Sequence, residues 1–337
     1  MYTVGPSLPD TYGASSPKGN YADLVTRGYE ISLSYDDSFN LAGHPFNYGV
    51  KATLADNRTF VTRYNNPTKS LSDYYEGQEI GEIWGFQFDG FFDDQDQIDN
   101  YYGQGVPYVN DLIQVHEGYL TRPGDVILRD RNGNHKVDKG SLTVDDPGDM
   151  VIVGNKHPRY MYSFSLNLEW NGIYASAMFQ GIGKQGWYPS GESIIWGQYH
   201  RPYGNALAWT VNNAWTPENK DAYLPKYTGY YRIFFSGQHK VDRYLFDASY
   251  LRLQNLQIGW NLPQKWVKRM GLGGLGFYFS GENLFTWAPI YRLTTDVDIA
   301  TATKGSDQDL GNGVDNFGDG NSLPSMRTFS LGVTIKI

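Results

Sequence analysis

The chain has 337 residues, with 39 Gly, 27 Tyr, 17 Phe and 9 Trp, no Cys, and only 19% charged residues. This composition favours strands and turns over helices, and it excludes disulfides and thiolate sites. The formal net charge of -8 argues against nucleic acid or an anionic bilayer surface as the main partner, and no apolar run approaches the roughly 18 residues of a membrane-spanning helix.

Apolar and polar residues alternate in several segments, which predicts strands with one apolar and one polar face. In chain order these segments are 27–35, 46–55, 162–170, 173–181, 250–263, 275–287 and 329–337. Asn171-Gly172 is the preferred dipeptide of a type I′ hairpin and predicts a tight turn. The apolar phase slips near Gln254, which predicts a β-bulge. Seven strands are therefore expected, or nine if 80–92 and 124–130 add a pair.

Such strands fit either a soluble sandwich or a membrane barrel. Three features favour the barrel. The apolar faces span about nine to eleven residues, as a tilted transmembrane strand requires, and aromatic residues bracket them, as in interfacial girdles. The connections also alternate between short and long, as the periplasmic turns and extracellular loops of outer-membrane barrels do. The short connections are 36–45, 171–172 and 263–274, and the long ones are 57–159, 183–244 and 288–325.

The predicted strand count is odd, whereas bacterial single-chain barrels have even numbers of strands. We therefore expect residues 1–337 to be the C-terminal part of a longer barrel, from which an N-terminal plug and the first strands are missing. If the short turns are periplasmic, the final strand ends at the periplasmic rim. Tyr162, Phe164, Leu166 and Leu168 are then expected to face lipid, and Ser163, Ser165 and Asn167 the lumen.

The chain resembles the C-terminal half of the barrel in SusC/RagA-family TonB-dependent transporters over nearly its whole length. The matching stretches include GASSPKGNYADLVTRGYEISLSY, IGEIWGFQFDGFF, GDVILRDRNGNHKVD, WTPEN, DASYLRLQNLQIGWNLP, GENLFTW and the terminal strand. The resemblance implies an all-β transmembrane antiparallel barrel of about 22 strands in the bacterial outer membrane. It also implies energised import of oligosaccharides or peptides, a SusD-like surface lipoprotein, and coupling to TonB through the missing N-terminal region. Ile337 departs from the aromatic residue with which the family usually ends.

Two loop motifs resemble ligand sites. The sequence DRNGNHKVD places Asp130, Asn132, Asn134, Lys136 and Asp138 at positions 1, 3, 5, 7 and 9 of an EF-hand-like calcium loop. His135 stands where that loop needs Gly, so a plain Asx-rich turn is the favoured alternative. GLGGLG matches a dinucleotide fingerprint, but it precedes a strand instead of opening a helix, which predicts a flexible turn.

Aromatic residues in one predicted extracellular loop are the candidate ligand contacts, because flat rings beside polar groups suit sugar stacking or peptide capture. They are Trp187, Tyr188, Trp196, Tyr199, Tyr203 and Trp209. The alternative is that they pack the loop against itself or against a lid protein.

Catalysis is not expected. The acidic clusters lie in polar loops, the histidines lack metal-ligand spacing, and no cofactor is required. The predicted function is nutrient import, with outer-membrane lipid as a partner and no nucleic acid. The alternative is a soluble all-β glycan-binding module.

Overall fold

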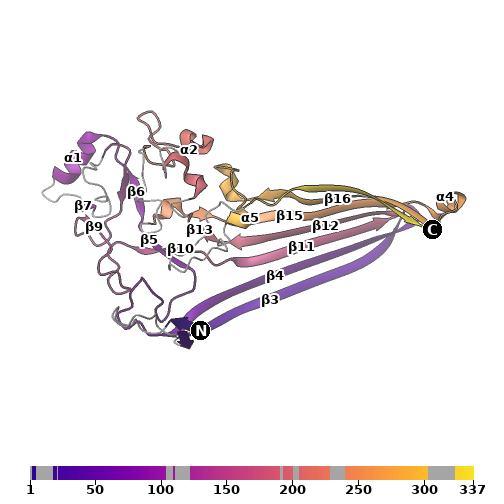
Figure 1. Ribbon diagram of the computed structural model, residues 1–337, viewed down its shortest axis with the longest axis horizontal. Coiled ribbons are helices and arrows are strands. Elements are labelled where there is room, and N and C mark those ends of the chain that lie inside the picture. Colours follow the sequence, from indigo (N-terminus) through magenta and orange to yellow (C-terminus); the bar gives the residue numbers. More distant parts are fainter. Residues whose placement is uncertain are drawn as a thin grey trace.

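The long alternating segments form one antiparallel sheet in the computed structural model (Figure 1). The structure describes residues 2–4, 18–20, 22–103, 109–110, 122–189, 193–199, 205–227, 240–302 and 323–337. The sheet has seven strands in the order β17-β16-β15-β12-β11-β4-β3. Their bounds are β3 (Ala22–Leu41), β4 (His44–Tyr64), β11 (Arg159–Trp170), β12 (Ile173–Lys184), β15 (Tyr250–Asn261), β16 (Gly274–Trp287) and β17 (Thr328–Lys336). Seven of the expected strands are thereby confirmed.

Tight turns join these strands at one end of the sheet. Asn171 and Gly172 have φ angles of 48° and 81°, as a type I′ turn requires. Ala42 and Gly43, with φ angles of 51° and 83°, make the equivalent turn between β3 and β4. The first hairpin is therefore longer than the sequence pattern indicated, because its strands continue through the polar stretch that was expected to be a connection. The expected bulge in β15 is present, with a register shift between Leu253 and Asn255.

The sheet has two chemically different faces because alternate residues point to opposite sides. The apolar face carries large side chains that remain exposed, including Leu33 (67%), Ile258 (46%) and Phe277 (46%). The polar face is dominated by hydroxyl and amide side chains such as Ser163, which hydrogen-bonds Thr53 across the ladder at 2.6 Å. An exposed apolar face of this extent is unusual for a protein surrounded by water.

On the polar face, tyrosine and glycine alternate across neighbouring strands near the tight turns. The ladder pairs Tyr174 with Gly259, Gly259 with Tyr278, and Tyr278 with Gly332. Each tyrosine ring lies against the backbone of the next glycine, where a Cβ atom would collide with the ring. We call these four residues the Tyr–Gly row.

The connections at the other end of the sheet are long and fold into a body with its own core (Figure 1). This loop body comprises the described residues within 65–158, 185–249 and 288–327. Its short strands are β5 (Glu82–Gly85), β6 (Phe88–Phe91), β7 (Val109–Asn110), β8 (Val126–Leu128), β9 (Lys136–Val137), β10 (Val151–Asn155), β13 (Gly186–Trp187) and β14 (Phe246–Asp247). Residues 80–92 and 124–130 thus contribute to small separate sheets, β5 with β10 and β6 with β8, and not to the large sheet.

In the part of the chain that the structure describes, the helices are short. They are α1 (Gln95–Gly103), α2 (Ala208–Asn212), α4 (Gln264–Arg269), α5 (Ile299–Ala302) and the 3₁₀ turns η2 (Ile194–Tyr199), η3 (Asp242–Tyr244) and η4 (Pro289–Arg292). A further small ladder joins β1 (Tyr2–Val4) to β2 (Lys18–Asn20). Within the part of the chain that the structure describes, no helix has the length and apolar character needed to cross a membrane. The GLGGLG segment is a turn with Gly271 at φ 73° that leads into β16, so no helix follows the motif.

Candidate functional site

The polar face of the sheet is a candidate ligand surface. Near the tight turns it has a hollow of about 760 Å³ over β3, β4, β11 and β12. Asp36, Asn167, Glu169 and Ser176 contribute carboxylate, amide and hydroxyl groups to its lining. Such groups can exchange hydrogen bonds with water or with a polar solute. This surface is therefore hydrophilic.

A buried ion pair joins the polar face to the loop body. Arg252 on β15 and Asp298, just before α5, form a salt bridge, and both side chains are less than 10% exposed. The Arg252 guanidinium also donates to the Thr286 hydroxyl at 2.8 Å and to the Ser325 hydroxyl at 2.9 Å. The Ser325 amide donates to the second Asp298 oxygen at 2.9 Å. Both ends of the loop between β16 and β17 are thus tied to the sheet.

This network fixes the ionisation of Asp298. Burial alone would raise its pKa, but the hydrogen bond from the Ser325 amide and the charge of Arg252 outweigh burial and hold the pKa below its ordinary value. The carboxylate is therefore charged at neutral pH. A hollow of about 300 Å³ beside the ion pair is lined by Asn283, Asp296 and Arg327 as well. Sequence patterns did not reveal the pair, because its members are 46 residues apart and no local signal links them.

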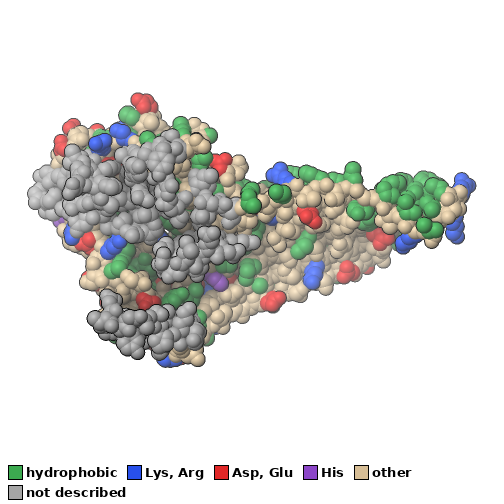
Figure 2. Space-filling model, in the orientation of Figure 1, with side chains coloured by type: hydrophobic (Ala, Val, Ile, Leu, Met, Phe, Trp, Pro, Cys, Tyr) green, Lys and Arg blue, Asp and Glu red, His purple; other side chains and the backbone are tan. Residues whose placement is uncertain are grey.

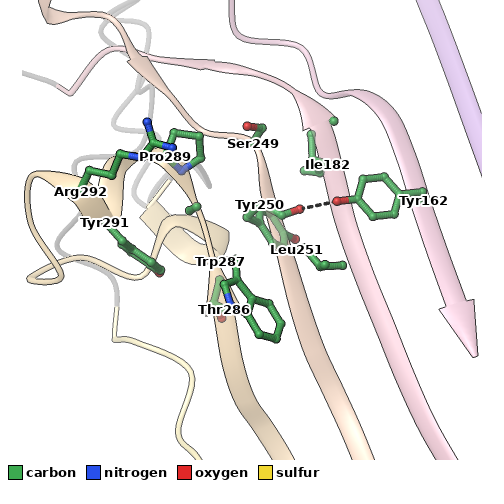
Figure 3. Close-up of a pocket in the computed structure, with 12 residues that line it drawn as sticks. Tyr162, Ile182, Ser249, Tyr250, Leu251, Thr286, Trp287, Pro289, Tyr291 and Arg292 are labelled. Atoms are coloured by element: carbon green, nitrogen blue, oxygen red, sulfur yellow. Dashed lines mark hydrogen bonds between the residues drawn. The ribbon is translucent and has the colours of Figure 1, made fainter.

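A second cavity, of about 580 Å³, lies where β11, β12, β15 and β16 meet the loop body (Figure 3). Tyr162, Leu251 and Trp287 line it from the apolar face of the sheet, and the Tyr162 hydroxyl donates to the Tyr250 carbonyl at 3.1 Å. In Figure 3 the Arg292 guanidinium extends toward Pro289 at the rim. The Tyr162 ring lies against Gly181, where a Cβ atom would be 2.6 Å from the ring. The cavity could hold the apolar part of an amphipathic molecule, with the polar end of that molecule near Arg292.

The predicted ligand-contact aromatics lie inside the loop body. Trp187, Tyr188, Trp196, Tyr199 and Trp209 are each at most 4% exposed. Phe246 is a common neighbour of the three tryptophans, with its ring centroid 5.8 Å from Trp187, 5.7 Å from Trp196 and 6.4 Å from Trp209. Tyr203 lies outside the described residues. The structure thus shows the packing that was the alternative interpretation, and contact between a ligand and these rings stays a prediction.

The two tyrosines of this set that the structure describes form hydrogen bonds with backbone groups. The Tyr199 hydroxyl donates to the Pro225 carbonyl at 2.7 Å, and the Tyr188 hydroxyl accepts from the Val241 amide at 3.2 Å. Burial raises the pKa of both hydroxyls, so both stay neutral. They therefore act as neutral cross-links between loop segments, and no titration near neutral pH changes them.

The EF-hand-like loop is a series of side-chain caps on backbone amides. The Asp130 carboxylate accepts from Gly133 and His135, each at 2.7 Å. Asn132 and Asn134 accept from the amides two residues on, at 2.9 and 2.8 Å, and Asp138 accepts from the Gly140 amide at 2.7 Å. Lys136, whose carbonyl would be the ligand at position 7, lies in β9. Calcium binding stays the less favoured interpretation of this loop.

Two further residues shape this loop. His135 has a φ of 63°, so it adopts the left-handed conformation that glycine usually supplies at the sixth position. Asp149 is fully buried and holds the two ends of the loop together. Its carboxylate accepts hydrogen bonds from the backbone amide of Arg131 at 2.7 Å and from the backbone amide of Asp138 at 3.0 Å. Sequence reasoning missed Asp149, since it follows in a separate Pro-Gly turn. In the described residues, no group of three or more acidic, His or Cys side chains is placed to hold a metal.

No protein-family model matches the chain. Curated relatives do: the chain is 25% identical to TonB-dependent receptor P3 of Formosa agariphila over 98% of its length, and 24% identical to TonB-dependent receptor P26 of the same organism over 98%. The chain resembles TonB-dependent receptors. It spans about a third of their length, 30% of P3 and 31% of P26.

The fold of the chain is also similar to part of solved structures of a peptide importer. The RagAB peptide importer in its open-open state superposes with a TM-score of 0.54 at 20% identity, covering 86% of this chain and 28% of that one. The closed-closed state gives a TM-score of 0.52 at 20% identity, covering 83% and 28%. These matches establish that this TonB-dependent-receptor-like chain shares the fold of part of those importers.

Proposed function

We propose that the chain is part of the barrel wall of an outer-membrane TonB-dependent transporter that imports oligosaccharides or peptides. The observation that carries this proposal is the sheet with one exposed apolar face and one polar face. In a closed barrel, the apolar face contacts lipid and the polar face lines the lumen. The strands of 12 residues or more exceed the roughly 9–11 residues that a tilted strand needs to cross the hydrocarbon.

The two edge strands of the sheet support the proposal that this chain forms only part of the barrel wall. Among the described strands, β17 pairs only with β16, and β3 pairs only with β4. An edge exposed to hydrocarbon would leave amide and carbonyl groups unpaired, at a cost of several kcal/mol each. We infer that further strands of the same transporter close a barrel of about 22 strands between these edges. The chain would then be the C-terminal part of that protein.

The orientation follows from the connections. The tight turns and Ile337 lie at one end of the sheet, and the loop body lies at the other (Figure 1). Outer-membrane barrels have short periplasmic turns and long extracellular loops, so the loop body would face the outside. There it is available to a SusD-like lipoprotein, while TonB would act on a plug contributed by another part of the protein. Relatives named TonB-dependent receptors and a peptide importer of the same fold support this assignment.

Cysteine labelling tests the facing of the wall, since this chain has no native cysteine. Leu166→Cys and Ser165→Cys are adjacent on β11 and form a matched pair in the complete transporter, expressed in the outer membrane. A charged, water-soluble maleimide should label Ser165→Cys from the lumen, and only a lipid-soluble maleimide should label Leu166→Cys. A soluble glycan-binding module would show no such division. Equal labelling of both positions by the charged reagent would disprove the barrel.

Import needs its own measurement. A strain lacking the transporter should lose uptake of either a labelled oligosaccharide pool or a labelled peptide pool, and a plasmid copy should restore it only when TonB is present. Loss of neither pool would contradict the transport function. This outcome would leave the barrel itself intact, because the labelling result does not depend on the substrate.

A further inference from the structure

The short helix α4 exposes apolar side chains at the tight-turn end of the sheet. It begins after Pro263, and Val267 is fully buried against the sheet. Trp266 and Met270 instead remain 49% and 50% exposed. The Trp266 ring makes an edge contact with Trp260 of the apolar face, with centroids 6.0 Å apart and an angle of 86°. The helix is therefore firmly seated, and its exposed apolar residues continue the apolar face of the sheet.

Basic residues surround this apolar tip. The six-residue helix carries three exposed basic side chains, Lys265, Lys268 and Arg269. We call these three the α4 basic patch. Across the residues that the structure describes, no carboxylate forms an ion pair with any of them. Figure 2 shows the tip as a group of hydrophobic side chains edged by basic ones.

Several cations of the loop body, by contrast, form ion pairs. In the loop body, Lys69 pairs with Asp145 at 3.2 Å, Arg129 with Asp89 at 2.9 Å, and Lys220 with Asp93 at 3.7 Å. The chain as a whole carries a net charge of -8. Three cations without an ion pair thus lie within five residues of a chain whose net charge is negative, and they lie beside two exposed aromatic rings.

We propose that the α4 basic patch binds the phosphate groups of anionic phospholipids in the membrane leaflet at the tight-turn end of the sheet. Tryptophan rings favour the boundary between headgroups and acyl chains, which would place Trp260 and Trp266 at that depth. Lys and Arg beside such rings can extend their charged ends to the headgroups. The inference rests on the proposed function, because only a membrane-embedded sheet brings a leaflet to α4.

The chemistry selects the lipid. Three cations close together attract a net negative headgroup, such as phosphatidylglycerol, more strongly than a zwitterionic one, such as phosphatidylcholine. Each basic residue near an anionic surface contributes roughly a fivefold factor in binding at low salt. Removing all three charges should therefore weaken the preference for the anionic lipid by up to about 100-fold. Salt should weaken it as well, since screening reduces such contacts.

Native mass spectrometry of the complete detergent-solubilised transporter tests this inference. The protein is titrated with phosphatidylglycerol and, separately, with phosphatidylcholine, and bound-lipid adducts are counted. The test variant is Lys265→Gln, Lys268→Gln, Arg269→Gln. The matched control is Lys69→Gln, Arg129→Gln, Lys220→Gln, which removes the same charges from the loop body. Heat modifiability on gels checks that both variants remain folded barrels.

We expect the natural protein and the control to retain phosphatidylglycerol in preference to phosphatidylcholine. In the test variant, the ratio of bound phosphatidylglycerol to bound phosphatidylcholine should fall at least about tenfold. Equal retention by the test variant would overturn the proposal. So would adducts that show no preference between the two lipids, or a patch occupied by a copurified acidic protein instead of lipid. A protein that is monodisperse without detergent would refute the membrane wall itself, whereas failed import with intact lipid preference would refute only the transport function.

Discussion

Leu166 and Ser165 are neighbours in β11, yet their side chains lie on opposite faces of the sheet. The ladder pairs Leu166 with Val50 and Ala177, and it pairs Ser165 with Lys51 and Met178. A charge at Leu166 would enter hydrocarbon in the proposed barrel, and a charge at Ser165 would enter the watery lumen. Introducing a charged side chain should therefore reduce stability by different amounts at these two adjacent positions.

We predict that Leu166→Arg lowers the unfolding free energy of the refolded transporter by about 2–4 kcal/mol, the cost of Arg near the bilayer midplane. Ser165→Arg should cost far less, because its guanidinium stays hydrated. Denaturant titration in lipid vesicles measures both values. Similar costs at the two positions would be inconsistent with a lipid-facing apolar side.

The ion pair between Arg252 and Asp298 gives a pH prediction. The folded-state pKa of Asp298 is held below its ordinary value of 3.8. Its contribution to stability is thus complete above that ordinary value and is lost as the pH falls through the lower, folded-state pKa. The loop between β16 and β17 should therefore be well protected at neutral pH and become more open toward pH 3.

Hydrogen exchange of segment 288–302 measures this opening. Asp298→Asn should destabilise the segment by about 3 kcal/mol at neutral pH, because it leaves the buried Arg252 charge without its partner. The variant should also lose the acid dependence. Arg252→Met with Asp298→Leu removes both charges and serves as the control, with a smaller loss. An acid response that persists in Asp298→Asn would assign the effect to another carboxylate.

At the scale of elements, the Tyr–Gly row binds the last strands together. Each glycine leaves space for the ring that crosses the ladder from the neighbouring strand. An aromatic ring covering a cross-strand glycine stabilises such pairs and fixes register. The row thus contributes to the correct pairing of β12, β15, β16 and β17.

A double-mutant cycle tests this contribution. Gly332→Val should destabilise the refolded transporter, because the new side chain displaces the Tyr278 ring. In a Tyr278→Ala background the same change should cost about 1 kcal/mol less, since no ring remains to be displaced. Ser330→Val, two residues away on the same face, is the control and should show no coupling to Tyr278→Ala. Additive effects at 332 and 278 would mean that the ring and the glycine act independently.

The loop from Asp130 to Asp138 gives a second prediction at this scale. The side-chain oxygens of Asp130, Asn132, Asn134 and Asp138 already accept backbone hydrogen bonds, so we expect the melting temperature to be unchanged by calcium or by a chelator. Differential scanning fluorimetry of the transporter and of Asp138→Ala measures this. A calcium-dependent rise in the natural protein that disappears in Asp138→Ala would establish a metal site instead.

The elements that could be predicted from sequence are those with local signals. Alternation predicted the seven long strands, and Asn171-Gly172 predicted its turn, because period and turn chemistry are written in neighbouring residues. The short strands of the loop body could not be predicted, since β5 pairs with β10 across more than 60 residues. Aromatic content likewise did not distinguish a ligand surface from a core: Trp187 and Trp196 are buried by Phe246, which no local pattern links to them.

At the scale of the whole molecule, the seven-stranded sheet leaves two ladders open. Only additional strands can satisfy the outer amide and carbonyl groups of β3 and β17 in hydrocarbon. We predict that residues 1–337 expressed alone aggregate and do not form a heat-modifiable, protease-resistant species in detergent. The complete transporter, prepared in parallel, should form one. A folded monomer of the isolated chain would show that the sheet can close on itself.

The core of the loop body separates two kinds of position in the same loops. Side chains such as Tyr244, Phe246 and Leu224 are almost wholly enclosed and hold the segments together, whereas residues between them reach the surface without supporting that core. Surface substitutions away from packed positions usually change stability by no more than about 0.5 kcal/mol. Natural selection can therefore exchange the outward residues repeatedly while the framework beneath them keeps its shape. The outward side chains of these loops can thus diverge in size, charge and polarity while the shared core keeps the loop body folded.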